Sequence, residues 1–312
     1  MTKYYGNCYF PQSPQRTHKD HKVIREKLIV VFVAILVVFV GNSGCSGSSS
    51  PSKQTRDSSG TRSDTIPGAF QITDLKSFYD QYQVDGMMVL SDSGRRNKIM
   101  YNPALYNKLT SPASTFNILL TLIGLEEGVL MDENSTLVRG NITYTSAYPG
   151  DTMNLREAFT NNRDWFFIRL SSLIGDEKIA GWLQRINYGN GSVEGEPNRF
   201  WINGKLVITP SQQVEFIRNF YFEKFPFSAK NYQLVKRLMW QKELNGANIY
   251  GKRGSNKLEQ EKRYTGWFVG YIESGNQVFF FTSFIESPDL DHPKLVDAQK
   301  EVVYKIIEHL HL

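Results

Sequence analysis

The serine with the clearest chemical setting is Ser114, in the segment SPASTFN (111–117) that opens a strongly apolar run. Asn117 follows three residues later, and on a helix this spacing puts both side chains on one face. A serine hydroxyl becomes an effective nucleophile only when a nearby base takes its proton. The amide of Asn117 has no useful basicity, so this pair lacks the base that acyl transfer requires.

Other nucleophiles and metal ligands are scarce. The two cysteines, Cys8 and Cys45, precede residue 69, which excludes a cysteine nucleophile, a disulfide or a cysteine-ligated zinc site in the remainder. The histidines stand at positions 18, 21, 292, 309 and 311, so a Ser-His-Asp triad or a histidine-rich metal site would need the C-terminal end. We interpret these histidines as surface residues and predict no metal and no cofactor.

The charge is unevenly distributed along the chain. Of 36 Lys/Arg and 31 Asp/Glu, nine and four precede residue 69, which leaves 27 of each sign in residues 69–312. A nucleic-acid-binding domain needs a basic face, so this balance argues against that class, although a local patch remains compatible with it.

The N-terminal region has the pattern of an export signal. Thirteen uninterrupted apolar residues, LIVVFVAILVVFV (28–40), follow a basic flank and are too few for the roughly 20 residues of a membrane span. The segment GNSGC, ending at Cys45, resembles a bacterial lipobox, with asparagine where leucine is usual. We predict an exported protein anchored in the membrane by a lipid at Cys45; cleavage without lipidation, giving a periplasmic or extracellular protein, or an uncleaved anchor are the alternatives.

The leader is therefore residues 1–45. Residues 46–68 are rich in Ser, Thr and Gly and predict a flexible linker. A single folded domain should occupy 69–312. Its apolar patterns predict an α+β order. The expected helices are a buried one over 114–127 that ends at Gly128, one helix or a helix pair over 155–175, helices over 176–187 and 209–222, and a last amphipathic helix after 293. The expected strands are a hairpin over 86–103 and strands over 247–254, 263–273 and 277–286.

Several motifs, taken in order, resemble one family. The region YNPALYNKLTSPASTFN (101–117), the segment LREAF, the tripeptide YGN (188–190), the Trp201 segment RFWINGKLVITPSQQVEF and the strands YGKRG and GWFVGYIE resemble the class D β-lactamases. These belong to the serine penicillin-recognising superfamily, which includes penicillin-binding transpeptidases. The resemblance implies a β-lactamase/transpeptidase-like fold, in which helices flank an antiparallel sheet and a helical subdomain lies beside it, with Ser114 between the two.

The resemblance also assigns motif positions. The superfamily pairs its nucleophile with a lysine in Ser-x-x-Lys, and class D enzymes use that lysine, carbamylated, as the base. Ser114 matches the nucleophile, but Asn117 stands at the lysine position. Asn162 stands at the serine of the second motif, so a proton-passing hydroxyl is lost there as well.

In the third motif, Lys252 and Gly254 match the family, and Arg253 replaces the hydroxyl that binds the substrate carboxylate. We predict that Arg253 takes over this role, because a guanidinium binds carboxylates in a bidentate way. Trp201 matches the tryptophan that covers the carbamate. The oxyanion hole would consist of backbone N–H groups of Ser114 and of a residue just after Gly254, near Ser255.

Asp164 stands where the second motif of the family has a valine that lies against the carbamate. We hypothesise that its carboxylate fills that space and accepts the Ser114 proton, with Asn117 as a hydrogen-bond donor. The simpler interpretation is that Asp164 pairs with Arg163, Arg253 or Lys252 and takes no part in chemistry.

Two functions follow from these residues. The first is a penicillin-binding acyl-serine protein of class D type, with Ser114 as nucleophile, Lys252 as electrostatic and proton-transfer partner, Trp201 as a packing lid, and weak or absent turnover. The second is a catalytically inactive envelope lipoprotein that binds peptidoglycan peptides or a protein partner. The expected ligand is a β-lactam or a peptidoglycan peptide, and a nucleic acid is not expected.

Overall fold

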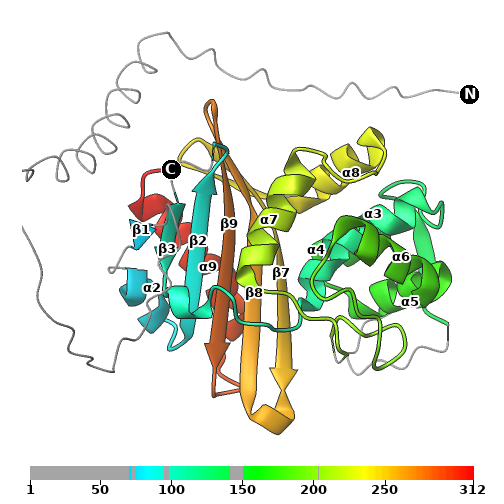
Figure 1. The fold of residues 1–312 in the computed structure, drawn as a ribbon, viewed down its shortest axis with the longest axis horizontal. Helices are drawn as coiled ribbons and strands as arrows, with labels where there is room; N and C mark the ends of the chain where they lie inside the picture. The colour runs from blue at the N-terminus through cyan, green and yellow to red at the C-terminus, as the bar shows by residue number, and fades with distance from the viewer. Residues whose placement is uncertain (1–69, 72–74, 95–97, 141–149, 203) are drawn as a thin grey trace, which may run out of the picture. The chain divides into compact units, whose positions relative to one another are not determined.

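The computed structural model describes residues 70–71, 75–94, 98–140, 150–202 and 204–312 (Figure 1). The predicted leader, its lipidation site Cys45 and the linker lie outside these residues. None of the described helices combines the length and apolar character needed to cross a bilayer.

The centre of the described chain is a seven-stranded sheet in the order β1-β3-β2-β9-β8-β7-β6 (Figure 1). All neighbours are antiparallel except the two-residue edge strand β1, which runs parallel to β3. The strands are β1 (Phe70–Gln71), β2 (Asp85–Asp92), β3 (Lys98–Tyr101), β6 (Trp240–Leu244), β7 (Ala247–Leu258), β8 (Arg263–Ser274) and β9 (Gln277–Ser287). A separate two-stranded sheet pairs β4 (Thr136–Val138) with β5 (Thr152–Asn154).

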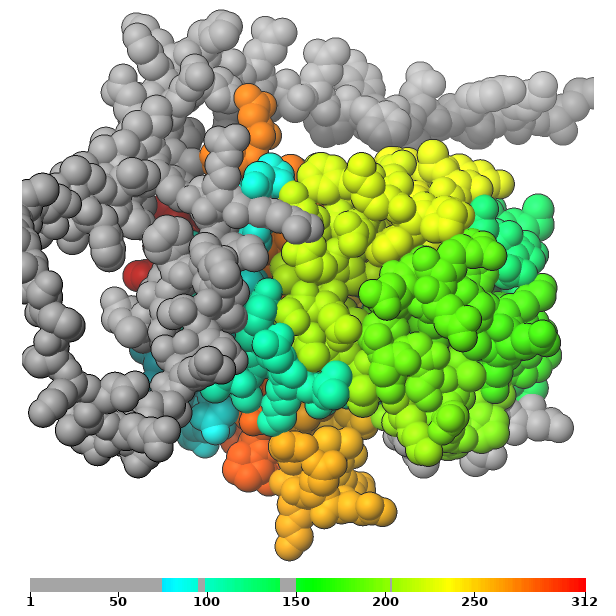
Figure 2. All heavy atoms as spheres, in the orientation of Figure 1, coloured from blue at the N-terminus to red at the C-terminus, as the bar shows by residue number. Residues whose placement is uncertain are grey.

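Helices cover both faces of the large sheet. α9 (Leu295–His309) contacts β7, β8 and β9 and packs beside α2 (Lys76–Asp80), whereas α7 (Pro210–Tyr221) contacts β8 and β9. A helical subdomain consists of α3 (Asn117–Glu126), α4 (Leu155–Thr160), α5 (Asp164–Ile174) and α6 (Asp176–Ile186). The helix α8 (Ala229–Met239) contacts α3 and α4, and in Figure 2 the yellow surface of α8 adjoins the green surface of the subdomain.

The alternation of side chains along the central strands builds two cores. Val269 of β8 and Phe284 of β9 face the helical subdomain and α7. Their neighbours Phe268 and Ile285 face α9. Because a strand sends successive side chains to opposite faces, an uninterrupted apolar run such as that of β9 is what a sheet buried on both faces requires.

The α+β fold and most predicted elements are confirmed. The helix that begins near Ser114 ends at Glu126, and Gly128 follows its C-cap with φ 72°. Thr209 caps α7 in a complete capping box with Gln212. The segment 155–175 is the helix pair α4 and α5.

Two details differ from the sequence prediction. Ser274 pairs with Gln277, so the hairpin between β8 and β9 turns on two residues rather than three, with Gly275 at φ 57°. α8, β6 and the small sheet β4–β5 were not predicted, since short polar segments such as WQKEL (240–244) carry no clear periodicity.

Candidate active site

Ser114 lies in a short 3-10 turn, Ala113–Phe116, that leads directly into α3. Ser114 is 7% exposed. The preceding Ala113 has φ 47°, a left-handed conformation that is unusual for a residue with a Cβ and that typically costs about 1–3 kcal/mol. The strained backbone directly before the serine must be held by its surroundings.

The segment around Trp201 supplies that support. The N–H of Ala113 donates to the Trp201 carbonyl at 3.0 Å, and the Ser111 hydroxyl donates to the same oxygen at 2.6 Å. The indole N–H of Trp267 donates to the Ser111 carbonyl at 2.9 Å. The buried Trp201 ring packs on Phe116, with centroids 5.5 Å apart. Trp201 therefore fixes the position of the serine turn through its backbone as well as its ring.

The hydroxyl of Ser114 donates a hydrogen bond to Oδ1 of Asp164 at 3.3 Å. Asp164 is half-buried and is the first residue of α5, where the helix dipole favours a carboxylate. In the ionised state it is acceptor-only, so it can take the hydroxyl proton. The carboxylate of Asp164 therefore lies within hydrogen-bonding distance of Ser114, the predicted nucleophile.

Asn117 is 1% exposed, and neither its Nδ2 nor its Oδ1 has a hydrogen-bond partner among the described residues. Its backbone carbonyl accepts a hydrogen bond from the Thr121 hydroxyl at 2.7 Å, but the side-chain amide takes no part in this bond. The predicted role of Asn117 as donor to Asp164 has no matching contact in the structure. An unsatisfied buried amide is costly, because it loses its hydrogen bonds to water without replacement.

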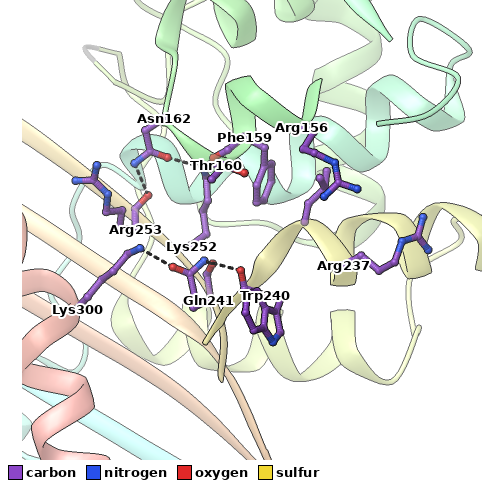
Figure 3. Close-up of a pocket in the computed structure, with 12 residues that line it drawn as sticks. Arg156, Phe159, Thr160, Asn162, Arg237, Trp240, Gln241, Lys252, Arg253 and Lys300 are labelled. Atoms are coloured by element: carbon purple, nitrogen blue, oxygen red, sulfur yellow. Dashed lines mark hydrogen bonds between the residues drawn. The ribbon is translucent and has the colours of Figure 1, made fainter. Parts of the chain in front are cut away.

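Asn162 connects the second and third motifs. Its φ of 50° lies in the left-handed region that asparagine tolerates. Its Nδ2 donates to the Arg253 carbonyl at 3.3 Å, and its Oδ1 accepts from Nζ of Lys252 (Figure 3). The amide thus serves as both donor and acceptor between the helical subdomain and β7.

Lys252 is 3% exposed, and its Nζ donates to the Phe159 carbonyl and lies 4.1 Å from the centre of the Phe159 ring. Burial, helped by the positive charges of Arg253 and Lys300, holds the pKa of Lys252 well below its usual value. Its ammonium contacts Asn162 and Phe159, so its predicted proton transfer with Ser114 would have to pass through another group.

β7 approaches the serine turn most closely at Gly254. A Cβ added at Gly254 would lie 2.8 Å from the Ser114 nitrogen and 2.7 Å from the Thr115 nitrogen, so only glycine fits. β6 pairs with β7 only as far as Tyr250. The part of β7 that contains Gly254 and Ser255 is therefore an edge among the described residues, as a backbone oxyanion hole requires.

Arg253 alternates with Lys252 along β7 and so leaves the strand on the other face. It lines the same cavity as Lys300 of α9. Its proposed contact with a substrate carboxylate stays a prediction, as do the catalytic roles of the other motif residues.

The comparisons with known proteins decide the family. A profile described as "Penicillin binding protein transpeptidase domain" matches residues 74–308. The chain belongs to this family. Regulatory protein BlaR1 of Bacillus licheniformis is 28% identical over 264 residues, which are 85% of this chain and 42% of BlaR1. β-Lactamase OXA-2 of Salmonella typhimurium is 30% identical over 224 residues, or 71% of this chain and 79% of that enzyme.

Solved structures agree with this assignment. The class D β-lactamase YbXI from Nostoc superposes with a TM-score of 0.70 at 30% identity, covering 77% of this chain and all (100%) of that one. The C-terminal domain of the Bacillus licheniformis BlaR penicillin-receptor gives 0.70 at 27% identity, covering 78% and 98%. The chain is thus homologous to class D β-lactamases and to the BlaR1 sensor, and it spans less than half of BlaR1 itself.

The sequence identified Ser114, Asp164, Asn162, Lys252 and Gly254. The structure brings Asp164 and Gly254 to Ser114, and it joins Asn162 to Lys252. The sequence-based prediction missed the Phe159 carbonyl, which accepts from Lys252. The one sequence signal for Phe159 was its place in the LREAF segment. The prediction also missed the strained Ala113, for which the sequence carries no signal.

Proposed function

We propose that this protein binds β-lactams covalently at Ser114, with Asp164 as the base and with weak or absent hydrolytic turnover. The observation that carries the proposal is the 3.3 Å hydrogen bond from the Ser114 hydroxyl to Asp164. In the first step the Ser114 oxygen attacks the lactam carbonyl and its proton passes to Asp164. The lactam C–N bond then breaks as Asp164 returns this proton to the lactam nitrogen, which leaves the drug as an ester on Ser114. A general base typically contributes about 10²–10⁴-fold to such a step.

The developing oxyanion would lie between the N–H of Ser114 and that of Ser255. The close approach of Gly254 to the Ser114 nitrogen supports this arrangement, because it brings the β7 backbone to the serine turn. Arg253 would bind the drug carboxylate if its flexible side chain turns back over the edge of β7.

Slow turnover follows from the residues around the ester. Deacylation needs a water molecule activated next to the acylated Ser114. Asn117, at the position we assign to the motif lysine, offers only an amide, so Asp164 would have to serve both steps. The likeness to the C-terminal domain of the BlaR penicillin-receptor supports a role in binding the drug.

Intact-protein mass spectrometry after incubation with benzylpenicillin tests this function. We expect a stable increase by the mass of one drug molecule, and no increase for Ser114→Ala. If the wild-type protein shows neither an adduct nor drug hydrolysis at high drug concentration, the proposal is wrong.

A second candidate is an inactive binding module. It is favoured by the hydrogen bond from the Lys252 ammonium to Asn162. This bond engages the group that the family would use near the nucleophile. In this case peptidoglycan peptides or a protein partner would bind without an acyl bond. Binding of a D-Ala-D-Ala peptide by Ser114→Ala with wild-type affinity, together with absent acylation of the wild type, would support this candidate.

We also propose that the protein is exported and held at the membrane by lipid on Cys45, on the strength of the leader pattern alone. Metabolic labelling with a palmitate analogue in a bacterial host should label the wild type and leave Cys45→Ala unlabelled. Equal labelling of both would contradict the anchor.

A further inference from the structure

A cavity of about 320 Å³ lies beside Lys252 (Figure 3). It is formed where α4, α8, β6, β7 and α9 meet, although these elements are far apart in the sequence. Neither Ser114 nor Asp164 lines it. The lining residues are Arg156, Phe159, Thr160, Asn162, Arg237, Leu238, Trp240, Gln241, Gly251, Lys252, Arg253 and Lys300.

The charge of this lining is one-sided. Five of the twelve residues are cations, and none is acidic. Arg156 and Arg237 share Glu133, which lies outside the lining; the Arg237–Glu133 distance is 3.9 Å. Lys252, Arg253 and Lys300 form no salt bridge with any carboxylate in the described part of the chain. Asp164 and Glu301 act on Lys252 and Lys300 only from beyond salt-bridge distance. The lining therefore has an excess of positive charge that a bound anion would balance.

The positive residues come from more than one side of the cavity. Figure 3 shows Arg156 and Arg237 on one side of Trp240 and Phe159, and Lys300 and Arg253 on the other. Lys300 is held in place, since its Nζ donates to Oε1 of Gln241 at 2.5 Å. Nε2 of Gln241 donates in turn to the Gly251 carbonyl at 2.9 Å.

We propose that this cavity, named here the cationic pocket, is a binding site for a multivalent oxyanion of the phosphate type. Arginine forks and lysine ammonium groups are the side chains that bind phosphate oxygens through charge-assisted hydrogen bonds. Cations on more than one side of a cavity suit an ion that carries several oxygens better than a single carboxylate.

The size of the cationic pocket bears on the form of the ligand. A volume of about 320 Å³ is several times that of a single ion, given that one water molecule takes about 30 Å³ in the liquid. The pocket therefore has room for a phosphate monoester as well as for free phosphate.

The shared residues Asn162 and Lys252 connect the cationic pocket to the acyl site. An anion beside Lys252 would favour its charged form and strengthen its hold on Asn162. The pocket does not depend on acylation, however, and its test does not require that Ser114 reacts.

Isothermal titration calorimetry with inorganic phosphate at constant ionic strength tests the site in the full chain. We expect one saturable site. Its affinity should fall about tenfold or more in Arg237→Gln and in Lys300→Gln, since a hydrogen bond to a charged group contributes about this factor. Arg237 is exposed and Lys300 is half-buried, so neither substitution opens the core, and far-UV circular dichroism confirms folding.

Two control variants locate the binding. Lys178→Gln removes an exposed cation on α6 that pairs with Glu127 at 2.8 Å, and it should bind phosphate like the wild type. Ser114→Ala should do the same. Equal losses in Lys178→Gln and the pocket variants would mean non-specific attraction. A loss in Ser114→Ala alone would place the ion at the acyl site. Either result overturns the proposal.

Glycerol 3-phosphate separates the two sources of the anion. Binding as tight as that of inorganic phosphate, and equally sensitive to Arg237→Gln, supports a phosphate monoester as ligand. Binding of inorganic phosphate only supports the free ion. If neither binds, the cationic pocket is not an oxyanion site.

Discussion

The hydroxyl of Ser114 and the carboxylate of Asp164 are joined by a 3.3 Å hydrogen bond, although the residues lie 50 positions apart. Each belongs to the first turn of a helical segment, the 3-10 turn before α3 and the helix α5. The bond gives Ser114 a proton acceptor where Asn117 cannot provide one. Substitutions of the residues around Ser114 test this arrangement.

Gly254→Ala should damage both stability and acylation. The new methyl group would meet the backbone nitrogens of Ser114 and Thr115 at 2.8 and 2.7 Å, and neither can move without the serine turn. Overpacking of this kind costs about 1–3 kcal/mol. Urea unfolding and the rate of benzylpenicillin acylation measure the two effects.

Gly181→Ala is the matched control. A Cβ at this position of α6 has no atom within 4 Å. Alanine in a helix interior is favoured by about 1 kcal/mol over glycine, so this variant should be slightly more stable and react normally. If Gly254→Ala is also stable and acylated at the normal rate, β7 does not approach the serine turn closely enough to exclude a methyl group.

Asn117→Leu should stabilise the protein by about 1–3 kcal/mol, because a buried amide without partners is replaced by an apolar group of similar size. Asn231→Leu is the contrasting variant. The amide of Asn231 is also buried but donates to Glu126 at 2.7 Å, so its loss should destabilise. Thermal unfolding compares them, and a destabilised Asn117→Leu would mean that this amide has a partner.

Much of this arrangement could be predicted from the sequence. Ser114, Asn162 and Lys252 were identified because they stand at motif positions. The Ser114–Asp164 contact could be hypothesised only through the resemblance, which relates two distant segments.

The cationic pocket could not be predicted. Arg156, Arg237 and Lys300 come from three helices, and the equal number of opposite charges in residues 69–312 gave no sign that they line one cavity. Likewise, the unpaired amide of Asn117 depends on the packing around it. Local patterns specify helices and turns, whereas the meeting of distant side chains depends on the completed fold.

Lys252→Met should change how stability depends on pH. The folded state holds the pKa of Lys252 below its unfolded value, so between those two values the unfolded state binds more protons. Stability therefore rises with pH across that window, by up to about 1.4 kcal/mol per pH unit. Since the variant lacks this group, its stability relative to the wild type should fall as the pH rises from 7 to 10.

Urea unfolding at pH 7, 8, 9 and 10 measures the difference, with the exposed Lys178→Met as control. The control should differ from the wild type by the same amount at each pH. A constant difference for Lys252→Met as well would show that Lys252 keeps the same pKa in both states.

Restoring the motif lysine should work only when Asp164 is also replaced. In Asn117→Lys alone, the new ammonium would pair with Asp164 and remove the base from Ser114. In Asn117→Lys with Asp164→Val, the lysine would be free to be carbamylated, as in class D enzymes. We expect the double variant to hydrolyse nitrocefin at least about 10²-fold faster than the wild type. Equal rates would show that other changes, such as Asn162, also limit turnover.

The rate of Ser114 acylation in Asp164→Asn tests the central claim most directly. The substitution keeps the shape and the contact but removes the basicity of the carboxylate. Intact-protein mass spectrometry over time, at one benzylpenicillin concentration, gives the rates for both proteins. We predict that acylation of Asp164→Asn is slower by about 10²–10⁴-fold. Acylation at the wild-type rate would contradict the assignment of Asp164 as the base.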